Sequence, residues 1–140
     1  MPTWIIYALI ATLFAGVTSV FVKSGIRDIN AELGLVIRIG IVFFVSIVNL
    51  FVMDAHKGQI QLSNRTLFYL IISGLTTSVC WIFYYKAIDI GNVSMISAID
   101  KGSIVITILM AVTFLGEPFT LKLALGTGLI LMGMVVLVWQ

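Results

Sequence analysis

Long apolar stretches alternate with short polar connections along this chain. Five stretches of about 20 mostly apolar residues could each cross a hydrocarbon layer about 30 Å thick as a helix. They cover residues 3–22, 33–53, 67–85, 93–115 and 121–139. The longest connection, 54–66, is too short to fold as a soluble domain. The pattern predicts an all-α membrane protein with five transmembrane helices, forming a single domain over residues 1–140.

The composition agrees with a membrane protein. Hydrophobic residues make up 61% of the 140 residues and charged residues only 10%, unlike a soluble domain. The net charge of +2 is spread without a basic cluster, which argues against nucleic-acid binding. Metal-ligand spacings, phosphate-binding loops and nucleophile–base patterns are missing from the sequence, and we expect the single histidine, His56, in solvent. We therefore expect neither an enzyme nor a cofactor.

The basic residues near the helix ends predict no preferred orientation in the membrane. Five spans place the two termini on opposite sides. Each side carries three basic residues: Lys57, Arg65 and Lys122 on the N-terminal side, and Lys23, Arg27 and Lys86 on the C-terminal side. The positive-inside rule orients a protein by an imbalance of such residues. Because there is none here, we expect a dual-topology protein that forms an antiparallel homodimer.

Two ionisable residues, Asp100 and Lys101, lie inside the fourth apolar stretch. Each costs about 2.5–3.5 kcal/mol at the centre of a spanning helix, so their presence indicates a function. Neighbours on a helix point about 100° apart, so we expect the two side chains not to pair with each other. On one continuous helix, Asp100 shares a polar face with Ser97 and Ser103, and we expect this face toward the bundle interior.

The partner of Asp100 stays open at this stage. Arg38 of the second stretch, Lys86, or Lys101 of a neighbouring protomer could each pair with it. These embedded charges all fall in the half of the membrane nearer the C-terminal side, which predicts a polar vestibule open to one side. In an antiparallel dimer two such vestibules face opposite ways, as in inverted-repeat transporters. A purely stabilising Asp100–Arg38 pair is the simpler alternative.

The third stretch adds a second candidate surface. Gly74, Ser78, Trp81 and Tyr85 follow one another at helical spacing. A hollow of small residues beside aromatic faces could hold an apolar or cationic group of a substrate. Aromatic residues near a helix end are also common anchors at the membrane interface, so this alternative remains.

Several short motifs occur in an order that resembles a known family. Phe-Tyr-Tyr-Lys-Ala-Ile at 83–88, Asp-Lys at 100–101, Phe-Leu-Gly-Glu at 114–117 and a glycine-rich last stretch resemble the EamA domain of the drug/metabolite transporter superfamily. The Asp-Lys step, Lys23-Ser-Gly and Arg38 resemble its half-size five-helix branch from bacteria and archaea. Many relatives carry proline just before Asp-Lys, whereas this chain has Ala98, so a helix break there is not predicted.

The resemblance implies half of an inverted-repeat transporter fold that works as a dimer. We expect a secondary active transporter, an exporter of small metabolites or drugs, in a prokaryotic inner membrane. The candidate residues for substrate and proton binding are Arg38, Trp81, Tyr85, Lys86, Ser97, Asp100, Lys101 and Ser103. The excess of basic groups favours an anionic substrate, although Asp100 could equally bind a cation. The alternative function is a non-transporting subunit that assembles with another membrane protein.

Overall fold

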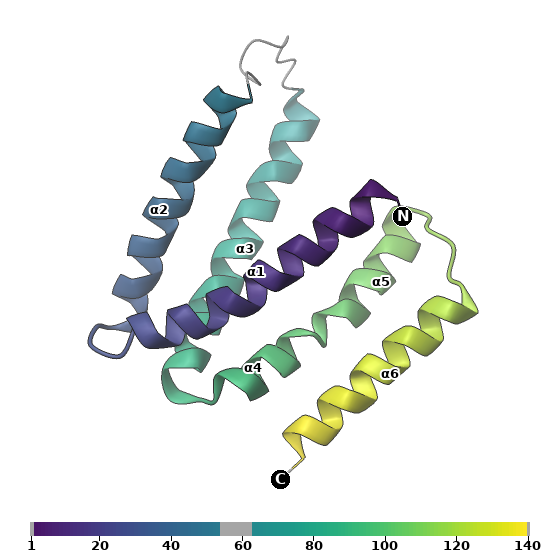
Figure 1. The fold of residues 1–140 in the computed structure, drawn as a ribbon. Coiled ribbons are helices and arrows are strands. Elements are labelled where there is room, and N and C mark those ends of the chain that lie inside the picture. Colours follow the sequence, from purple (N-terminus) through teal and green to yellow (C-terminus); the bar gives the residue numbers. More distant parts are fainter. Residues whose placement is uncertain (1, 54–62, 140) are drawn as a thin grey trace. The chain divides into compact units, whose positions relative to one another are not determined.

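Helices account for nearly all of the described chain. The computed structural model describes residues 2–53 and 63–139 (Figure 1). The helices are α1 (Thr3–Gly25), α2 (Ala31–Val52), α3 (Asn64–Ile90), α4 (Val93–Asp100), α5 (Ser103–Phe114) and α6 (Leu121–Val138). Within the described residues, α1, α2, α3, the combined segment Val93–Phe114 and α6 are long and apolar enough to cross a membrane. The five predicted transmembrane helices are therefore confirmed. His56 and Lys57 lie outside the described residues.

The chain divides into two compact units. One is Phe21–Ile90, and the other combines Met1–Val20 with Gly91–Gln140. The single domain expected over residues 1–140 stays a prediction.

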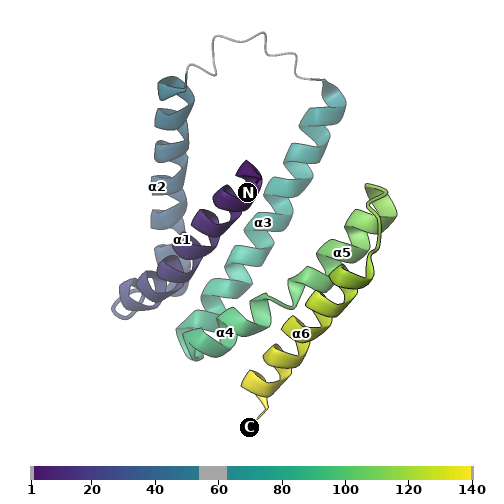
Figure 2. The same ribbon diagram turned by 45° about the vertical axis from the view of Figure 1, so that its right-hand side comes forward.

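In the unit Phe21–Ile90, helices α2 and α3 run antiparallel (Figures 1 and 2). The buried residues lie at the end of α1, in the connection that follows it, at the start of α2 and at the end of α3. The buried side chains are Val22, Ile26, Ala31, Leu35, Tyr85 and Ile88. Tyr85 is 2% exposed and Ile88 is fully covered. Gly34 allows this close approach, because a Cβ added there would lie 2.7 Å from Ile26 Cγ2. In lipid, helices associate mainly through close packing, because the hydrophobic effect does not drive them together. A small residue such as Gly34 favours this packing.

In the other unit, α5 and α6 form a hairpin through the turn predicted at 115–120. Gly116 has φ +69°, a left-handed conformation that glycine adopts without strain and that commonly ends a helix. The hydroxyl of Thr120 accepts a hydrogen bond from the Leu123 N–H at 3.2 Å and so caps the start of α6. Pro118 lies in the loop just before Thr120.

The fourth span is broken, which corrects the prediction of one continuous helix over 93–115. Helix α4 ends at Asp100 and α5 begins at Ser103. Across the break the hydrogen bonds connect residues three apart: Lys101 N–H donates to Ala98 O (3.1 Å) and Gly102 N–H donates to Ile99 O (2.8 Å). This tighter pattern is typical of a 3₁₀ turn, which inside a helix often marks a functional hinge.

Gly102 explains why the chain breaks there without proline. Glycine lowers helix stability by about 1 kcal/mol relative to alanine, so the α-helix is weakest at this point. A Cβ added at Gly102 would lie 3.0 Å from Ile99 O and 3.1 Å from Met134 Sδ. The missing side chain therefore lets Met134 of α6 pack directly against the turn.

Candidate functional site

Lys23 holds the end of α3. Its ammonium group donates hydrogen bonds to the carbonyl oxygens of Ile88 (2.5 Å) and Asp89 (2.8 Å). The last carbonyls of a helix lack partners within the helix and carry partial negative charge, so a cation there is favourable. The sequence predicted Lys23 on the C-terminal side of the membrane, but it did not predict that Lys23 caps another helix.

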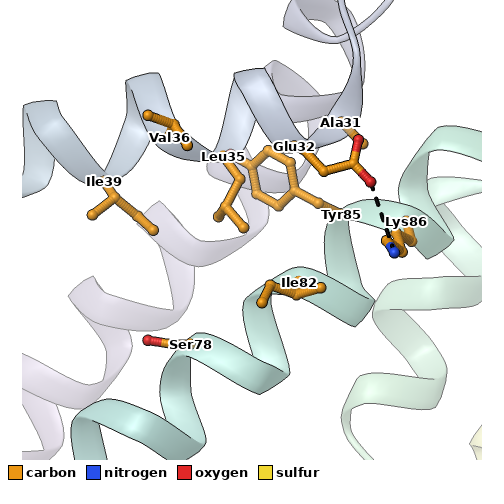
Figure 3. Close-up of a pocket in the computed structure, with 9 residues that line it drawn as sticks. All are labelled: Ala31, Glu32, Leu35, Val36, Ile39, Ser78, Ile82, Tyr85 and Lys86. Atoms are coloured by element: carbon orange, nitrogen blue, oxygen red, sulfur yellow. Dashed lines mark ion pairs between the residues drawn. The ribbon is translucent and has the colours of Figure 1, made fainter.

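Glu32 and Lys86 form an ion pair across α2 and α3. Their side chains are 3.7 Å apart and both are more than half exposed. Figure 3 shows this pair at one end of a pocket of about 330 Å³, with Ser78 at the far end. Leu35, Ile39 and Ile82 supply apolar walls between them. Lys86 was predicted as a site residue, whereas Glu32 was missed.

Arg38 lies against the aromatic residues of α3. Its guanidinium carbon is 3.6 Å from the centroid of the Trp81 ring and 6.0 Å from that of Tyr85. A cation over an aromatic face at this distance is attracted by the ring quadrupole. Three predicted site residues thus come together on α2 and α3. Tyr85 itself is packed in the core.

A second pocket, of about 250 Å³, lies beside this cation–π contact. It is lined by Arg38, Ile39, Val42, Thr77, Ser78 and Trp81. Ile39 and Ser78 also line the first pocket. The predicted stripe on α3 therefore lines two pockets through Ser78, Trp81 and Tyr85. One face of the Trp81 ring receives Arg38, and Trp81 also lines this pocket.

Asp100 and Lys101 pair with each other, which corrects a second prediction. Lys101 Nζ is 3.2 Å from Asp100 Oδ2. The expected divergence of about 100° holds for neighbours on a regular helix. This divergence concerns where the side chains leave the backbone, and the long, flexible stem of Lys101 reaches around the turn to the neighbouring carboxylate.

The predicted polar face around Asp100 is divided by the same break. Ser97 is half-buried on α4, while Ser103 is exposed at the first position of α5. On α5, Thr107 donates its hydroxyl to Ser103 O at 3.1 Å. Asp100 and Arg38 belong to different units, and their pairing stays a prediction.

Sequence reasoning missed two residues that line these pockets, Glu32 and Thr77. Glu32 belongs to the first turn of α2, which starts at Ala31, but the prediction began that helix at residue 33 and left Glu32 in the connection before it. Thr77 lies next to Ser78 on α3 and was not considered. Over residues 2–53 and 63–139, the structure brings no group of three His, Cys, Asp or Glu side chains together that could hold a metal ion.

Comparison with known proteins places the chain in a family. The EamA-like transporter family matches residues 2–139. The chain is 31% identical over 135 residues to the protein named "Uncharacterized transporter in cobO 3'region" of Sinorhizobium sp, covering 96% of both chains. It is 28% identical over 138 residues to an uncharacterized protein of Methanocaldococcus jannaschii, covering 98% of this chain and 97% of the other. Solved structures gave no match.

These relatives have nearly the same length as this chain, which agrees with the half-size five-helix form. The resemblance read from the short motifs is thus confirmed over almost the whole sequence. The chain is a multi-pass membrane protein that belongs to the EamA-like transporter family.

Proposed function

We propose that this protein is a secondary active transporter that exports small metabolites or drugs across a prokaryotic inner membrane. The observation that carries the proposal is the break in the fourth span, which holds the ionised pair Asp100–Lys101. Transporters commonly build their binding sites from interrupted helices. Ionisable residues in a spanning segment also mark pathways for substrates and protons.

The ion pair suggests how transport is coupled. Asp100 and Lys101 together are neutral, so their contact lowers the cost of holding both in the membrane. A proton or a substrate group that takes the place of Lys101 on Asp100 keeps the carboxylate neutralised and releases the lysine. Ser97 and Ser103, on either side of the break, supply hydroxyl groups to the substrate. In the unit Phe21–Ile90, Arg38, Trp81 and Lys86 are proposed separately as substrate-binding residues, whereas Tyr85, which is 2% exposed, supports them from the core.

Proton-coupled flux tests the role of Asp100. The purified chain is placed in liposomes with a pH-sensitive dye inside, and a panel of small organic acids and cations is added outside. We expect at least one compound to move protons with the unaltered chain and none to do so with Asp100→Asn. Glu117→Gln, which removes an exposed carboxylate from the loop before α6, should keep the flux. Normal flux with Asp100→Asn would contradict the proposed coupling.

We further propose that the working unit is an antiparallel homodimer. The balanced basic residues on the two sides support insertion in both orientations. Cys80 is the chain's single cysteine and is exposed, so it is first replaced by alanine. A cysteine is then introduced at position 3 or 140 and labelled from outside intact cells. Each position should label in part of the population, whereas labelling of one position alone would exclude dual topology.

One observation favours the alternative function, a non-transporting subunit. On α6, a Cβ added at Gly126, Gly128 or Gly133 would meet nothing within 4 Å. Small residues with open space beside them can receive a helix of another membrane protein. A stable complex with a different membrane protein, together with no flux by the chain alone, would favour this alternative.

A further inference from the structure

Arg38 differs from the two lysines that the structure describes where α1, α2 and α3 meet. Lys23 donates to backbone carbonyls and Lys86 pairs with Glu32. For Arg38, the described residues supply two aromatic faces and neither a carboxylate within 4.0 Å nor a hydrogen-bond acceptor. A guanidinium group carries five N–H donors. Arg38 follows the start of α2 by about two turns, so these donors lie within a membrane-spanning segment, where leaving them unpaired is costly.

The pocket of about 250 Å³ beside Arg38 adds one more unpaired polar group. The hydroxyl of Ser78 donates to Gly74 O at 2.9 Å. The neighbouring Thr77 also lines the pocket, and none of the described residues receives a hydrogen bond from its hydroxyl. Ile39, Val42 and Trp81 provide apolar walls. The pocket thus combines one cation, one available hydroxyl and an apolar surface.

We propose that Arg38 and Thr77 bind the carboxylate of a small amphipathic monoanion whose apolar part lies against Ile39 and Val42. A planar carboxylate accepts two parallel hydrogen bonds from a guanidinium group. The pocket offers one positive charge, so a dianion such as phosphate would keep an uncompensated charge in apolar surroundings. A cationic ligand would be repelled by Arg38. The inference rests on the proposed function, because it identifies the class of molecule that is transported.

Trp81 makes the pocket directly observable. The chain has three tryptophans, and replacing Trp4 and Trp139 by phenylalanine leaves Trp81 as the single reporter. The full-length variant is placed in nanodiscs of neutral phosphatidylcholine and titrated with phenylacetate. Phenylacetamide and 2-phenylethylammonium have a similar apolar part but no charge and a positive charge, respectively. We expect a saturable change in Trp81 fluorescence with phenylacetate and none with the other two.

Substitutions in the same background identify the binding groups. Arg38→Gln should weaken phenylacetate binding by about tenfold or more, since it removes a charge-assisted hydrogen bond. Arg38→Lys keeps the positive charge but cannot donate two parallel hydrogen bonds, so its affinity for phenylacetate should lie between that of the protein with Arg38 and that of Arg38→Gln. This variant tests the site even if Arg38→Gln folds poorly. Thr77→Val should weaken binding by a few-fold. Arg65→Gln is the matched control, because Arg65 also lies near an aromatic ring, Tyr69, at 5.9 Å.

Several results would overturn the inference. These are no saturable response to phenylacetate, a response to 2-phenylethylammonium instead, or equal affinity in the folded Arg38 variants. Loss of the phenylacetate response in nanodiscs containing phosphatidylglycerol would also overturn it, because the pocket would then hold an anionic lipid headgroup. Binding of phenylacetate without flux in liposomes would contradict transport and leave the pocket intact. Asp100-dependent flux of a cation without phenylacetate binding would contradict the pocket and leave transport intact.

Discussion

The two units of this protein hold their charged side chains in different ways. In Phe21–Ile90, charges connect one helix to another: Lys23 of α1 binds the end of α3, and Glu32 of α2 pairs with Lys86 of α3. In the unit that contains α4 to α6, Asp100 pairs with the next residue, Lys101. A hydrogen bond or ion pair between two helices restrains the movement of one helix relative to the other. A pair between neighbours can open without separating any helix from another.

Burial follows the same division. Every buried hydrophobic side chain of the described residues belongs to Phe21–Ile90, with Tyr85 and Ile88 at its centre. The other unit has a 3₁₀ turn at Asp100–Gly102 instead of a buried cluster. We infer that Phe21–Ile90 serves as the rigid part of the transporter and that the broken fourth span serves as the part that changes conformation.

The largest effect should come from emptying the core of Phe21–Ile90. Tyr85→Ala removes a ring that is 2% exposed, and we expect the free energy of unfolding to fall by about 3 kcal/mol. Tyr7→Ala removes a ring that is 72% exposed and should change it by less than about 0.5 kcal/mol. Unfolding in detergent followed by circular dichroism measures both. Similar losses of unfolding free energy in the two variants would contradict the inference that Phe21–Ile90 has the more tightly packed core.

Overfilling the same core should have the next largest effect. Gly34→Ala brings a Cβ within 2.7 Å of Ile26 Cγ2, a branched side chain that is 4% exposed. The clash should cost about 1–3 kcal/mol of unfolding free energy. Gly40→Ala on the same helix meets nothing within 4 Å and should be neutral or slightly stabilising. The comparison fails if Gly40→Ala is the more harmful substitution.

Removing the cap on α3 should have a smaller and local effect. Lys23→Met keeps the length of the side chain but loses its hydrogen bonds to Ile88 O and Asp89 O. We expect a loss of about 1 kcal/mol, visible as faster amide hydrogen exchange at the end of α3. Lys122→Met, at the start of α6, provides the control and should leave that exchange unchanged. An unchanged rate in Lys23→Met would show that α1 does not hold α3.

The exposed ion pairs should have the smallest effect on stability. A double-mutant cycle of Glu32→Gln and Lys86→Gln should give a coupling energy of about 0.2–1 kcal/mol, because both side chains are more than half exposed. The same cycle on Asp100→Asn and Lys101→Gln should give a similar value while changing transport far more. A coupling energy well above this range for Asp100–Lys101 would show that the pair is structural.

The five spans were predictable because helix length and hydrophobicity are set by the membrane. The break in the fourth span was not, since Ala98 replaces the expected proline and a single glycine in an apolar stretch is usually tolerated. The Asp100–Lys101 contact was missed because the prediction considered where the two side chains leave the backbone and not how far the flexible lysine stem can reach. Lys23 could not be matched with its partners from the sequence, because they are backbone carbonyls on a distant helix. Glu32 was missed through an error of two residues in the start of α2.

The break at Asp100–Gly102 also bears on how the protein is made. Helix α4 is about 12 Å long and α5 about 18 Å, so neither alone can cross the bilayer and both must enter it as one segment. Asp100 can pair with Lys101 without the presence of any other helix, because the two are neighbours in the sequence. Arg38, in contrast, must wait for most of α3 to leave the ribosome before Trp81 can cover it. We therefore expect the second span to enter the membrane with Arg38 uncovered, whereas the fourth span can enter it with Asp100 and Lys101 already paired.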